Sequence, residues 1–515
     1  MSRMLPAPVL RTPAGEVRHH ERAVILVGAL VALAVGLWTC WSLTVDDAFI
    51  TYRYSDNLAR GHGLVWNPGQ DPVEGFTNFA WMAWHVPFAA AGVPLPLVSK
   101  VTAGLCAATT VWLLVRETRT RAGALVAAGC FALFLPTWVH TMSGLETAPF
   151  ALVVLRAVVV AARSLQGVEV RVWELPVLVL VAGMLRPDGI LAVGVPLLVW
   201  LYLRRAELAP RVWSVAAGVV GAAYMGWRWS YFGHALPNTF YTKVGVDAAT
   251  DGRWIQMTAA LLLPLLVVAA AGLLGARPGP VVVALAACAA LYVVPALSAP
   301  AMDYLSRFAW HGFPLLCLAA GWVLDQVEAR RAAAIAASVA LVWTTVAGVL
   351  HPDGRTLVNY GVDLQRAHVA IGKALADQEL PPTERSVAVT DAGAIPYFSE
   401  WAATDYIGLN DERIAHGADP TGVLLADAPT VVVVTSSSGE QPTSEGRVDL
   451  PTVLGDRVWV GSVQMRDGYF EHLFAPGDVA GPLQDALAHR TGEAHTADPR
   501  LDLSYWRWVQ RLISS

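Results

Sequence analysis

The chain has 515 residues, of which 55% are hydrophobic and 15% are charged, and its mean hydropathy is +0.47. Soluble domains carry about a quarter charged residues, so this composition excludes an ordinary soluble protein and predicts a polytopic membrane protein. The formal net charge of −5 argues against a nucleic-acid partner. The cysteines lie in apolar segments without paired spacing, and we interpret them as core residues rather than disulfides or metal ligands.

The N-terminal segment is predicted to stay on the protein. Residues 1–22 contain four arginines, and the apolar run 23–43 is long enough to span a membrane. No small-residue cleavage site follows that run. We therefore expect a cytoplasmic tail over residues 1–22 and a retained first membrane helix after it.

Apolar runs continue to about residue 350 and predict an α-helical transmembrane domain over residues 23–350. The expected spans are 23–43, 98–115, 122–139, 147–163, 173–186, 190–203, 211–230, 254–275, 279–298, 307–325 and 332–350. With eleven spans, the arginine-rich loops fall on the side of the N-terminus, as the positive-inside rule requires. Segment 79–94 is short and contains His85 and Pro87, so we predict that it lies in the interface or re-enters the membrane, inside a first outer loop over residues 44–97.

Residues 351–515 have a different pattern. Segment 362–377 has a helical period, and segments 385–393 and 430–437 are short and strand-like. This predicts a small α/β domain, which the parity of the spans places outside the membrane.

Five polar segments then share the outer side of the membrane: 44–78, 143–147, 186–189, 232–243 and 302–307. The basic loops on the other side contain nothing comparable. A one-sided collection of acids, amides and cations beside a membrane indicates a site for a lipid-borne polar substrate.

Asp46 and Asp47 are the candidate catalytic residues. Adjacent carboxylates just outside a membrane can supply a general base, because partial desolvation and mutual repulsion raise one pKa toward neutrality. The alternative is that both acids cap the helix that begins near Ala48 and complement its dipole.

The candidate substrate-binding residues lie in the same polar segments. They are Arg53, Glu74, Glu146, Arg186, Asp188, His234, Asn238, Lys243, Asp303 and Arg307. Cations on the outer side, Arg228 among them, are not needed for orientation, and they suit a phosphate group.

Structural alternatives remain open for several of these residues. Arg53 could snorkel from an interfacial helix, and Glu146 could cap a helix. Arg186 could pair with Asp188 in a turn, and Asp303 with Arg307 at i,i+4. In the outer domain, acids, amides and aromatics over residues 390–411 could hold a sugar or could belong to ordinary turns. No metal-ligand set stands out, although carboxylates near a lipid phosphate could recruit a divalent cation.

The segments DDAFITYRY, LARGHGLVWNPG and VEGFTN, followed by SGLET, LRPDG, YFGHALPNTFYTK and TDAGAIPYFS, resemble the GT-C superfamily of membrane glycosyltransferases. The similarity covers most of residues 44–411. It is greatest to the terminal β-(1→2)-arabinofuranosyltransferase type of mycobacteria and corynebacteria. The last 100 residues show no such resemblance.

The resemblance implies that Asp46 or Asp47 is the catalytic carboxylate. It also implies a polyprenyl-phosphate sugar donor such as decaprenyl-phosphoryl arabinofuranose, and a terminal arabinan acceptor in the cell wall. We expect a multi-pass monomer of the plasma membrane, with its C-terminal domain outside and no nucleotide cofactor, because no Gly-rich nucleotide-binding motif is present.

Three alternatives stay open: the same reaction with another sugar such as mannose, a transporter or flippase for lipid-linked sugars, and a noncatalytic glycan-binding subunit. The stereochemical outcome is also open, because one general base predicts inversion whereas retention needs a carboxylate nucleophile or a front-face route.

Overall fold

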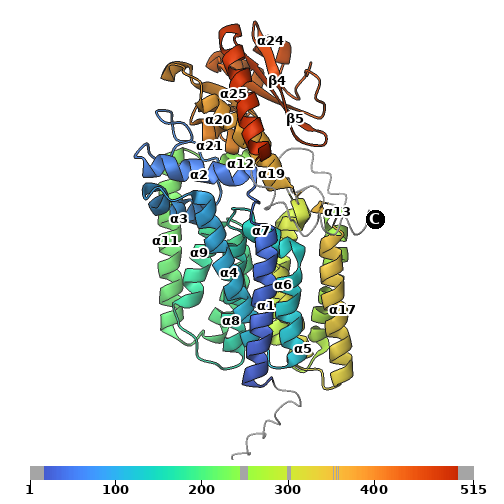
Figure 1. Ribbon diagram of the computed structural model, residues 1–515. Coiled ribbons are helices and arrows are strands. Elements are labelled where there is room, and N and C mark those ends of the chain that lie inside the picture. The colour runs from blue at the N-terminus through green and yellow to red at the C-terminus, as the bar shows by residue number, and fades with distance from the viewer. Residues whose placement is uncertain are drawn as a thin grey trace, which may run out of the picture.

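The structure is a computed structural model that describes residues 17–243, 253–297, 303–351, 353, 354, 357 and 359–496. A bundle of long helices forms one end of the molecule, and a domain containing a β-sheet covers the other end of the bundle (Figure 1). The division agrees with the predicted helical and α/β parts. The predicted tail 1–22 lies mostly outside the described residues, and the first helix already begins at His19.

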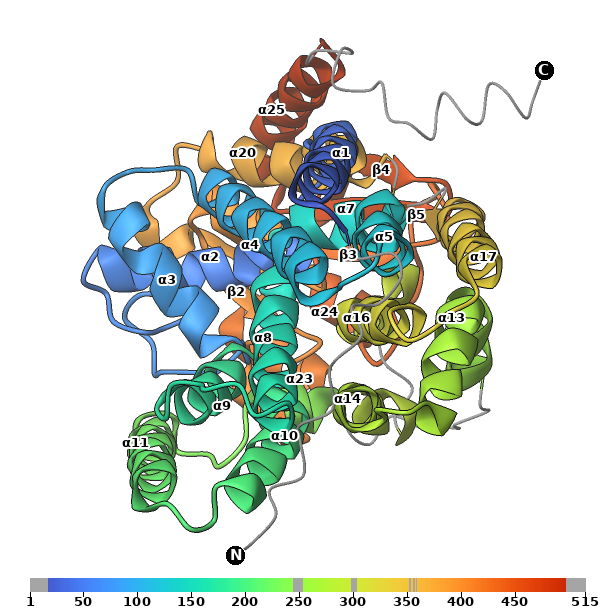
Figure 2. The ribbon, with the colours of Figure 1, turned by 90° about the horizontal axis from the view of Figure 1, so that it is seen from below.

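The bundle is built from the apolar runs of the sequence. Its helices are α1 (His19–Thr39), α4 (Leu95–Glu117), α5 (Arg121–Ala124), α6 (Cys130–Leu133), α7 (Leu135–Met142), α8 (Thr147–Leu165), α9 (Glu174–Leu185), α10 (Gly189–Leu203), α11 (Leu208–Phe232), α13 (Arg253–Ala271), α14 (Gly279–Leu297), α15 (Arg307–Trp310), α16 (Phe313–Leu324) and α17 (Arg330–Val349). The π-helical turn η1 (Leu125–Gly129) joins α5 to α6. Seen end-on, α8 and α16 lie inside the bundle and α11 lies at its edge (Figure 2).

Seven described helices are long and apolar enough to cross a membrane. An eighth candidate is the pair Arg121–Leu133 and Leu135–Met142, which is bent by 55°. Helices α9, α10 and α16 are shorter. Every predicted span contains helix, so the multi-pass architecture is confirmed, whereas the number eleven stays a prediction.

Two predicted spans are interrupted. The run 122–139 bends at Phe134, whose backbone is extended, just before Pro136 enters the next helix. Proline cannot donate the backbone hydrogen bond that a continuous helix requires. The run 307–325 is divided into α15 and α16, and α16 has Pro314 in its first turn.

Three helices lie between the bundle and the C-terminal domain: α2 (Asp46–Ala59), α3 (Phe79–Ala90) and α12 (Asn238–Lys243). Helix α2 crosses the end of the bundle beneath the domain (Figure 1). It is less apolar than the long helices, yet most of its side chains are buried, because the domain covers them.

The C-terminal domain has a five-stranded sheet in the order β2-β1-β3-β5-β4. Its strands are β1 (Ser386–Val389), β2 (Ala402–Asp405), β3 (Val431–Ser436), β4 (Val458–Arg466) and β5 (Tyr469–Ala475). Strands β2, β1 and β3 are parallel, whereas β5 is antiparallel to both β3 and β4. The valines of β3 are buried on both faces of the sheet, as expected for a central strand between two layers.

Helices surround this sheet. They are α19 (Tyr360–Leu364), α20 (Ala370–Ala376), α21 (Ala394–Ser399), α22 (Glu412–Ala415), α23 (Pro420–Asp427), α24 (Leu450–Leu454) and α25 (Gly477–Thr496), and the π-helical turn η4 (Gln365–Val369) joins α19 to α20. The α/β prediction for this part of the chain is confirmed. Strands β1 and β3 lie inside the expected segments, and the helix at 360–376 begins two residues before the expected 362–377.

Aromatic side chains join the two parts of the molecule. The ring of Phe49 on α2 lies 5.4 Å from Tyr397 and 5.3 Å from Phe398, both on α21. Phe49 is 1% exposed and belongs to the same apolar cluster as the sheet residues Val387 and Val431. Helix α2 therefore shares an apolar core with the domain.

Candidate active site

The side chain of Asp46 is hydrogen-bonded to residues of the C-terminal domain. Its carboxylate accepts hydrogen bonds from Nδ1 of His368 at 2.8 Å and from the backbone N–H groups of Gly393 and Ala394 at 2.9 Å each. Its own backbone N–H donates to the Tyr360 hydroxyl at 3.3 Å. The carboxylate is buried, and these donors use the lone pairs that a general base would need.

Asp47 lies in a different environment. It is partly exposed, and it follows Asp46 in a helix, where consecutive side chains point about 100° apart. Its negative charge acts on the hydroxyl of Tyr304, from the helix bundle, and on that of Tyr360. Of the two aspartates, Asp47 is therefore the more exposed.

Glu146, Arg186 and Asp188 form one cluster at this end of the bundle. Arg186 donates from Nη1 to Glu146 at 3.1 Å and from Nε to Asp188 at 3.0 Å. Asn78 donates to the other oxygen of Glu146 at 2.8 Å. The ion pair between Arg186 and Asp188, which was the predicted structural alternative, is present. Arg186 also binds Glu146, which lies 40 residues earlier in the chain.

Arg307 lies beside the same cluster. Its guanidinium carbon is 4.9 Å from the ring centre of Phe308 and 5.4 Å from that of Tyr304. The guanidinium carbon of Arg186 is 5.4 Å from the same Phe308 ring. Arg307 is 7% exposed and the side chain of Arg186 is 14% exposed, so one buried and one partly buried cation face the same aromatic ring.

The guanidinium of Arg307 has no ion-pair partner in the part of the chain that the structure describes. Among the described residues, no carboxylate lies within 4 Å of its guanidinium, and its buried Nε has no hydrogen-bond acceptor. The predicted i,i+4 pair with Asp303 is therefore not formed. Asp303 instead accepts from Nε1 of Trp254 at 2.8 Å and from the Phe308 backbone at 2.9 Å, and its burial raises its pKa to about 6.

A strained turn positions Arg307. Leu305 and Ser306 have φ angles of 49° and 52°, which side chains other than glycine seldom adopt. The turn is held by Leu305, whose carbonyl lies 3.1 Å from His140 Nε2 and whose N–H donates to Asp353 at 2.8 Å. Strain of this kind is concentrated at functional sites.

Arg53 lies in the interface between α2 and the C-terminal domain. Its guanidinium donates to the backbone carbonyls of Trp66, Pro396 and Trp401 and to the side chain of Asn67. Burial lowers its pKa to about 10. Because these acceptors use the donors of the guanidinium, we leave Arg53 out of the phosphate site.

Glu74 and Arg228 form a buried ion pair of 2.6 Å. Burial raises the pKa of Glu74, and the guanidinium opposes that rise. The Glu74 carbonyl accepts from the backbone of Asn238 at 3.0 Å, which fixes the start of α12. His234 pairs with Glu412 and stacks on His416, and the side chain of Lys243 lies outside the described residues.

The outer-domain residues expected to hold a sugar are mostly used for folding. Asp405 accepts from the backbone of Ile407, Gly408 and Asn410. Tyr397 packs on Phe49. The Asp405 side chain is therefore not available to an acceptor, whereas Tyr397 is partly exposed.

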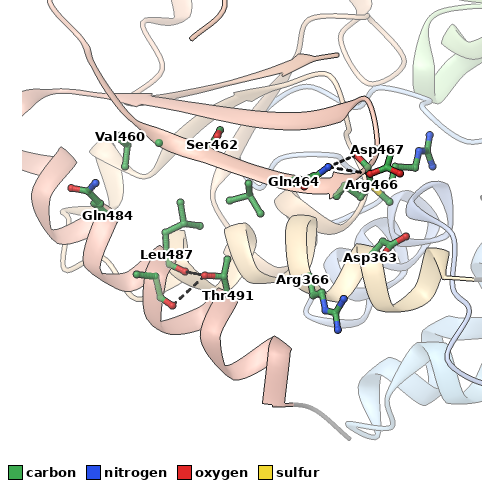
Figure 3. A pocket seen from close by; sticks show the side chains of 14 residues that line it. Asp363, Arg366, Val460, Ser462, Gln464, Arg466, Asp467, Gln484, Leu487 and Thr491 are labelled. Atoms are coloured by element: carbon green, nitrogen blue, oxygen red, sulfur yellow. Dashed lines mark hydrogen bonds between the residues drawn. The ribbon is translucent and has the colours of Figure 1, made fainter. Parts of the chain in front are cut away.

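A groove elsewhere in the domain has a more suitable lining. It has a volume of about 560 Å³ and lies between α19, η4, the edge strand β4 and α25. Asp363 and Arg366 lie opposite Gln464, Arg466 and Asp467 (Figure 3). Arg466 also lies over the Tyr360 ring at 5.9 Å, so this end of the groove adjoins the residue that binds the backbone of Asp46.

Sequence analysis missed Tyr304, Phe308 and His368. The two aromatic residues lie within or next to segment 302–307, and an aromatic residue beside an outer arginine was the available signal. No sequence signal marks His368, because it belongs to an ordinary amphipathic helix that packs beneath the sheet.

Comparison with solved structures identifies the architecture. The chain superposes on ArnT from Cupriavidus metallidurans bound to undecaprenyl phosphate with a TM-score of 0.56 and 15% identity, covering 88% of this chain and 97% of ArnT. The chain has the GT-C fold. This GT-C fold is also similar to arabinofuranosyltransferase AftD from Mycobacteria, with a TM-score of 0.50 and 15% identity, covering 91% of this chain but only 40% of AftD.

Sequence comparisons give less information about function than the comparison with solved structures. Residues 358–476 match a family described as "Domain of unknown function (DUF8728)", which includes all five strands of the outer domain. No curated protein matches the chain significantly.

Proposed function

We propose that the protein transfers a sugar from a polyprenyl-phosphate carrier to a glycan at the outer face of the membrane. The observation that carries the proposal is that the guanidiniums of Arg186 and Arg307 both lie against Phe308. Arg307 is buried and has no ion-pair partner among the described residues. A phosphate would supply the missing anion and the acceptor for the buried Nε of Arg307. The likeness to an ArnT structure that holds undecaprenyl phosphate supports this class of ligand.

In the proposed reaction, an acceptor hydroxyl attacks the anomeric carbon of the donor. The bond between that carbon and the phosphate oxygen breaks, and the polyprenyl phosphate leaves. Asp47 takes the proton of the hydroxyl as general base. The leaving phosphate gains negative charge, which Arg186 and Arg307 stabilise.

For the substrates, we propose decaprenyl-phosphoryl arabinofuranose as donor and terminal cell-wall arabinan as acceptor. The resemblance of the sequence motifs and the similarity to the AftD fold support this choice. The acceptor chain would lie in the groove along β4, whose arginine, amide and carboxylate side chains can hydrogen-bond to sugar hydroxyls.

The test uses the purified full-length protein with an arabinan acceptor and either the arabinofuranose donor or the corresponding mannose donor. We expect extension from the arabinofuranose donor, loss of extension in Asp47→Asn, and retention in Arg60→Gln, which changes an exposed arginine just after the end of the same helix. Extension from mannose alone would keep the mechanism and replace the donor. Full activity of Asp47→Asn would refute the general-base role.

A further inference from the structure

Four titratable side chains from separate elements meet where α2 contacts the outer domain. They are Asp46 of α2, His368 of η4, Asp391 from the loop after β1, and Glu471 of β5. The side chains of His368 and Glu471 are each 1% exposed, that of Asp46 is 5% exposed, and that of Asp391 is 20% exposed. The site proposed for glycosyl transfer uses none of the three outer-domain residues.

The two nitrogens of His368 have different surroundings. Nδ1 donates to Asp46 at 2.8 Å, which fixes the orientation of the ring. Nε2 lies 3.3 Å from Oε1 of Glu471 and 3.9 Å from Oδ2 of Asp391. Although it is buried, Nε2 makes no well-formed hydrogen bond to an acceptor among the described residues.

These separations suit ligands that share one metal ion. With metal–ligand bonds of about 2.0–2.1 Å, neighbouring ligands of a tetrahedral zinc ion stand about 3.4 Å apart. The Nε2–Oε1 separation is close to that value, and the Nε2–Oδ2 separation requires a small side-chain adjustment. An imidazole oriented by a carboxylate on its other nitrogen is the usual arrangement of a metal-binding histidine.

Neighbouring hydroxyls hold both carboxylates in place. Tyr469 donates to Oδ2 of Asp391 at 2.7 Å. Thr435 Oγ1 lies 3.3 Å from Asp391 and 3.3 Å from each oxygen of Glu471. Both acids are therefore held beside the imidazole.

The charge balance also calls for a cation. Three carboxylates surround one imidazole, so the cluster carries excess negative charge even when His368 is protonated. Burying uncompensated charge is costly, and buried charges are normally paired or coordinate metals. A divalent ion would neutralise most of this excess negative charge. Protonation of Glu471 is the alternative way to reduce it.

We propose that His368, Asp391 and Glu471 bind a divalent transition-metal ion, Zn²⁺ in preference to Ca²⁺, and that Asp46 orients the imidazole. Imidazole nitrogen favours zinc over calcium, which prefers six to eight oxygen ligands. The ion would fix the outer domain to α2, because Asp46 binds both His368 and the loop that follows Asp391. This site is independent of the proposed transferase activity.

The chain contains a second histidine cluster that serves as a control. His234, Glu412 and His416 have ligand atoms within 4.8 Å of one another, as do Asp46, His368 and Asp391. They are less buried, and His234 already pairs with Glu412. Zinc bound there would be lost in His234→Gln and kept in His368→Gln.

The experiment uses the full-length protein in detergent, purified without a histidine tag and stripped with EDTA. We expect titration with Zn²⁺ to show one tight site per chain that Ca²⁺ does not fill, and metal analysis after gel filtration to give one zinc. Binding should weaken at least tenfold in His368→Gln and Glu471→Gln and stay unchanged in His234→Gln. A Zn²⁺-induced rise in the melting temperature of the wild type should be absent from the first two variants.

Wild-type protein that binds no zinc would overturn the proposal in favour of a proton on Glu471. Zinc retained at full affinity by a folded His368→Gln variant would overturn it as well. If both variants fail to fold, the wild type still decides the question. Bound Co²⁺ should then give a visible absorption band that Zn²⁺ displaces, and its absence would count against the site.

Discussion

Asp46 accepts a hydrogen bond of 2.8 Å from Nδ1 of His368, a residue 322 positions later in the chain. This contact distinguishes Asp46 from its neighbour Asp47, although the sequence alone gives no reason to treat the two aspartates differently. Asp46 joins the outer domain to α2, whereas Asp47 remains partly exposed beside Tyr304. Their substitutions should therefore have different consequences.

Asp47→Asn should lower kcat by about 10²–10⁴, the usual contribution of a general base, and lower the melting temperature less than Asp46→Asn does. Asp46→Asn should instead destabilise the protein by about 3 kcal/mol, because it removes the charged partner of a buried histidine. Donor-dependent transfer and thermal unfolding of both variants check this. Equal loss of stability in the two variants would contradict the division of roles.

Arg307→Gln should weaken binding of undecaprenyl phosphate by at least tenfold, because the buried charge against Phe308 is lost. Arg307→Lys should recover only part of the affinity, since an ammonium group cannot bind phosphate with a planar fork. Arg60→Gln is the control, because Arg60 is about half exposed and pairs with Asp56 and Glu400. Lipid-phosphate affinity measured in detergent should be unaffected in the control.

The carboxyl group of Asp303 should make stability depend on pH. Burial raises its pKa from 3.8 to about 6, so between these values the folded protein binds more protons than the unfolded chain. Stability should therefore fall as the pH rises from about 4 to 6, by at most about 3 kcal/mol, and then level off. Asp303→Asn should flatten the melting-temperature profile in this window, whereas Asp71→Asn, in an exposed loop, should not.

Arg53→Lys should loosen the outer domain. A single ammonium group cannot reach all the acceptors that the guanidinium now bridges, including the carbonyls of Trp66 and Trp401. Leaving those groups buried and unpaired costs about 1–3 kcal/mol each. We expect faster hydrogen exchange in residues 394–403, with the bundle helices unchanged, and an unaltered exchange pattern would contradict the role given to Arg53.

The predicted and observed elements agree where local pattern is sufficient. The apolar run 279–298 became α14, Gly279–Leu297, and the valine run near residue 431 became β3. The sequence did not predict the breaks near Phe134 and Gly312, because composition alone measures how apolar a run is and not whether its backbone stays helical.

The candidate site was predicted in part. Glu146, Arg186 and Asp188 were named from their shared side of the membrane, and the structure joins them by hydrogen bonds. Arg53 and Asp46 were named by the same argument, but the structure uses both to hold the outer domain. A polar residue near a membrane surface is expected to contact another polar group. Its polarity does not show whether that group belongs to a bound ligand or to another part of the protein.

The sequence by itself determined a multi-pass helical protein with a terminal α/β domain and a polar face on one side, because hydrophobic runs and alternation depend on neighbouring residues. The tertiary structure decided which polar groups face one another: His368 on Asp46, and Arg186 and Arg307 on Phe308. Those pairings depend on how distant segments pack, so no local pattern in the chain records them.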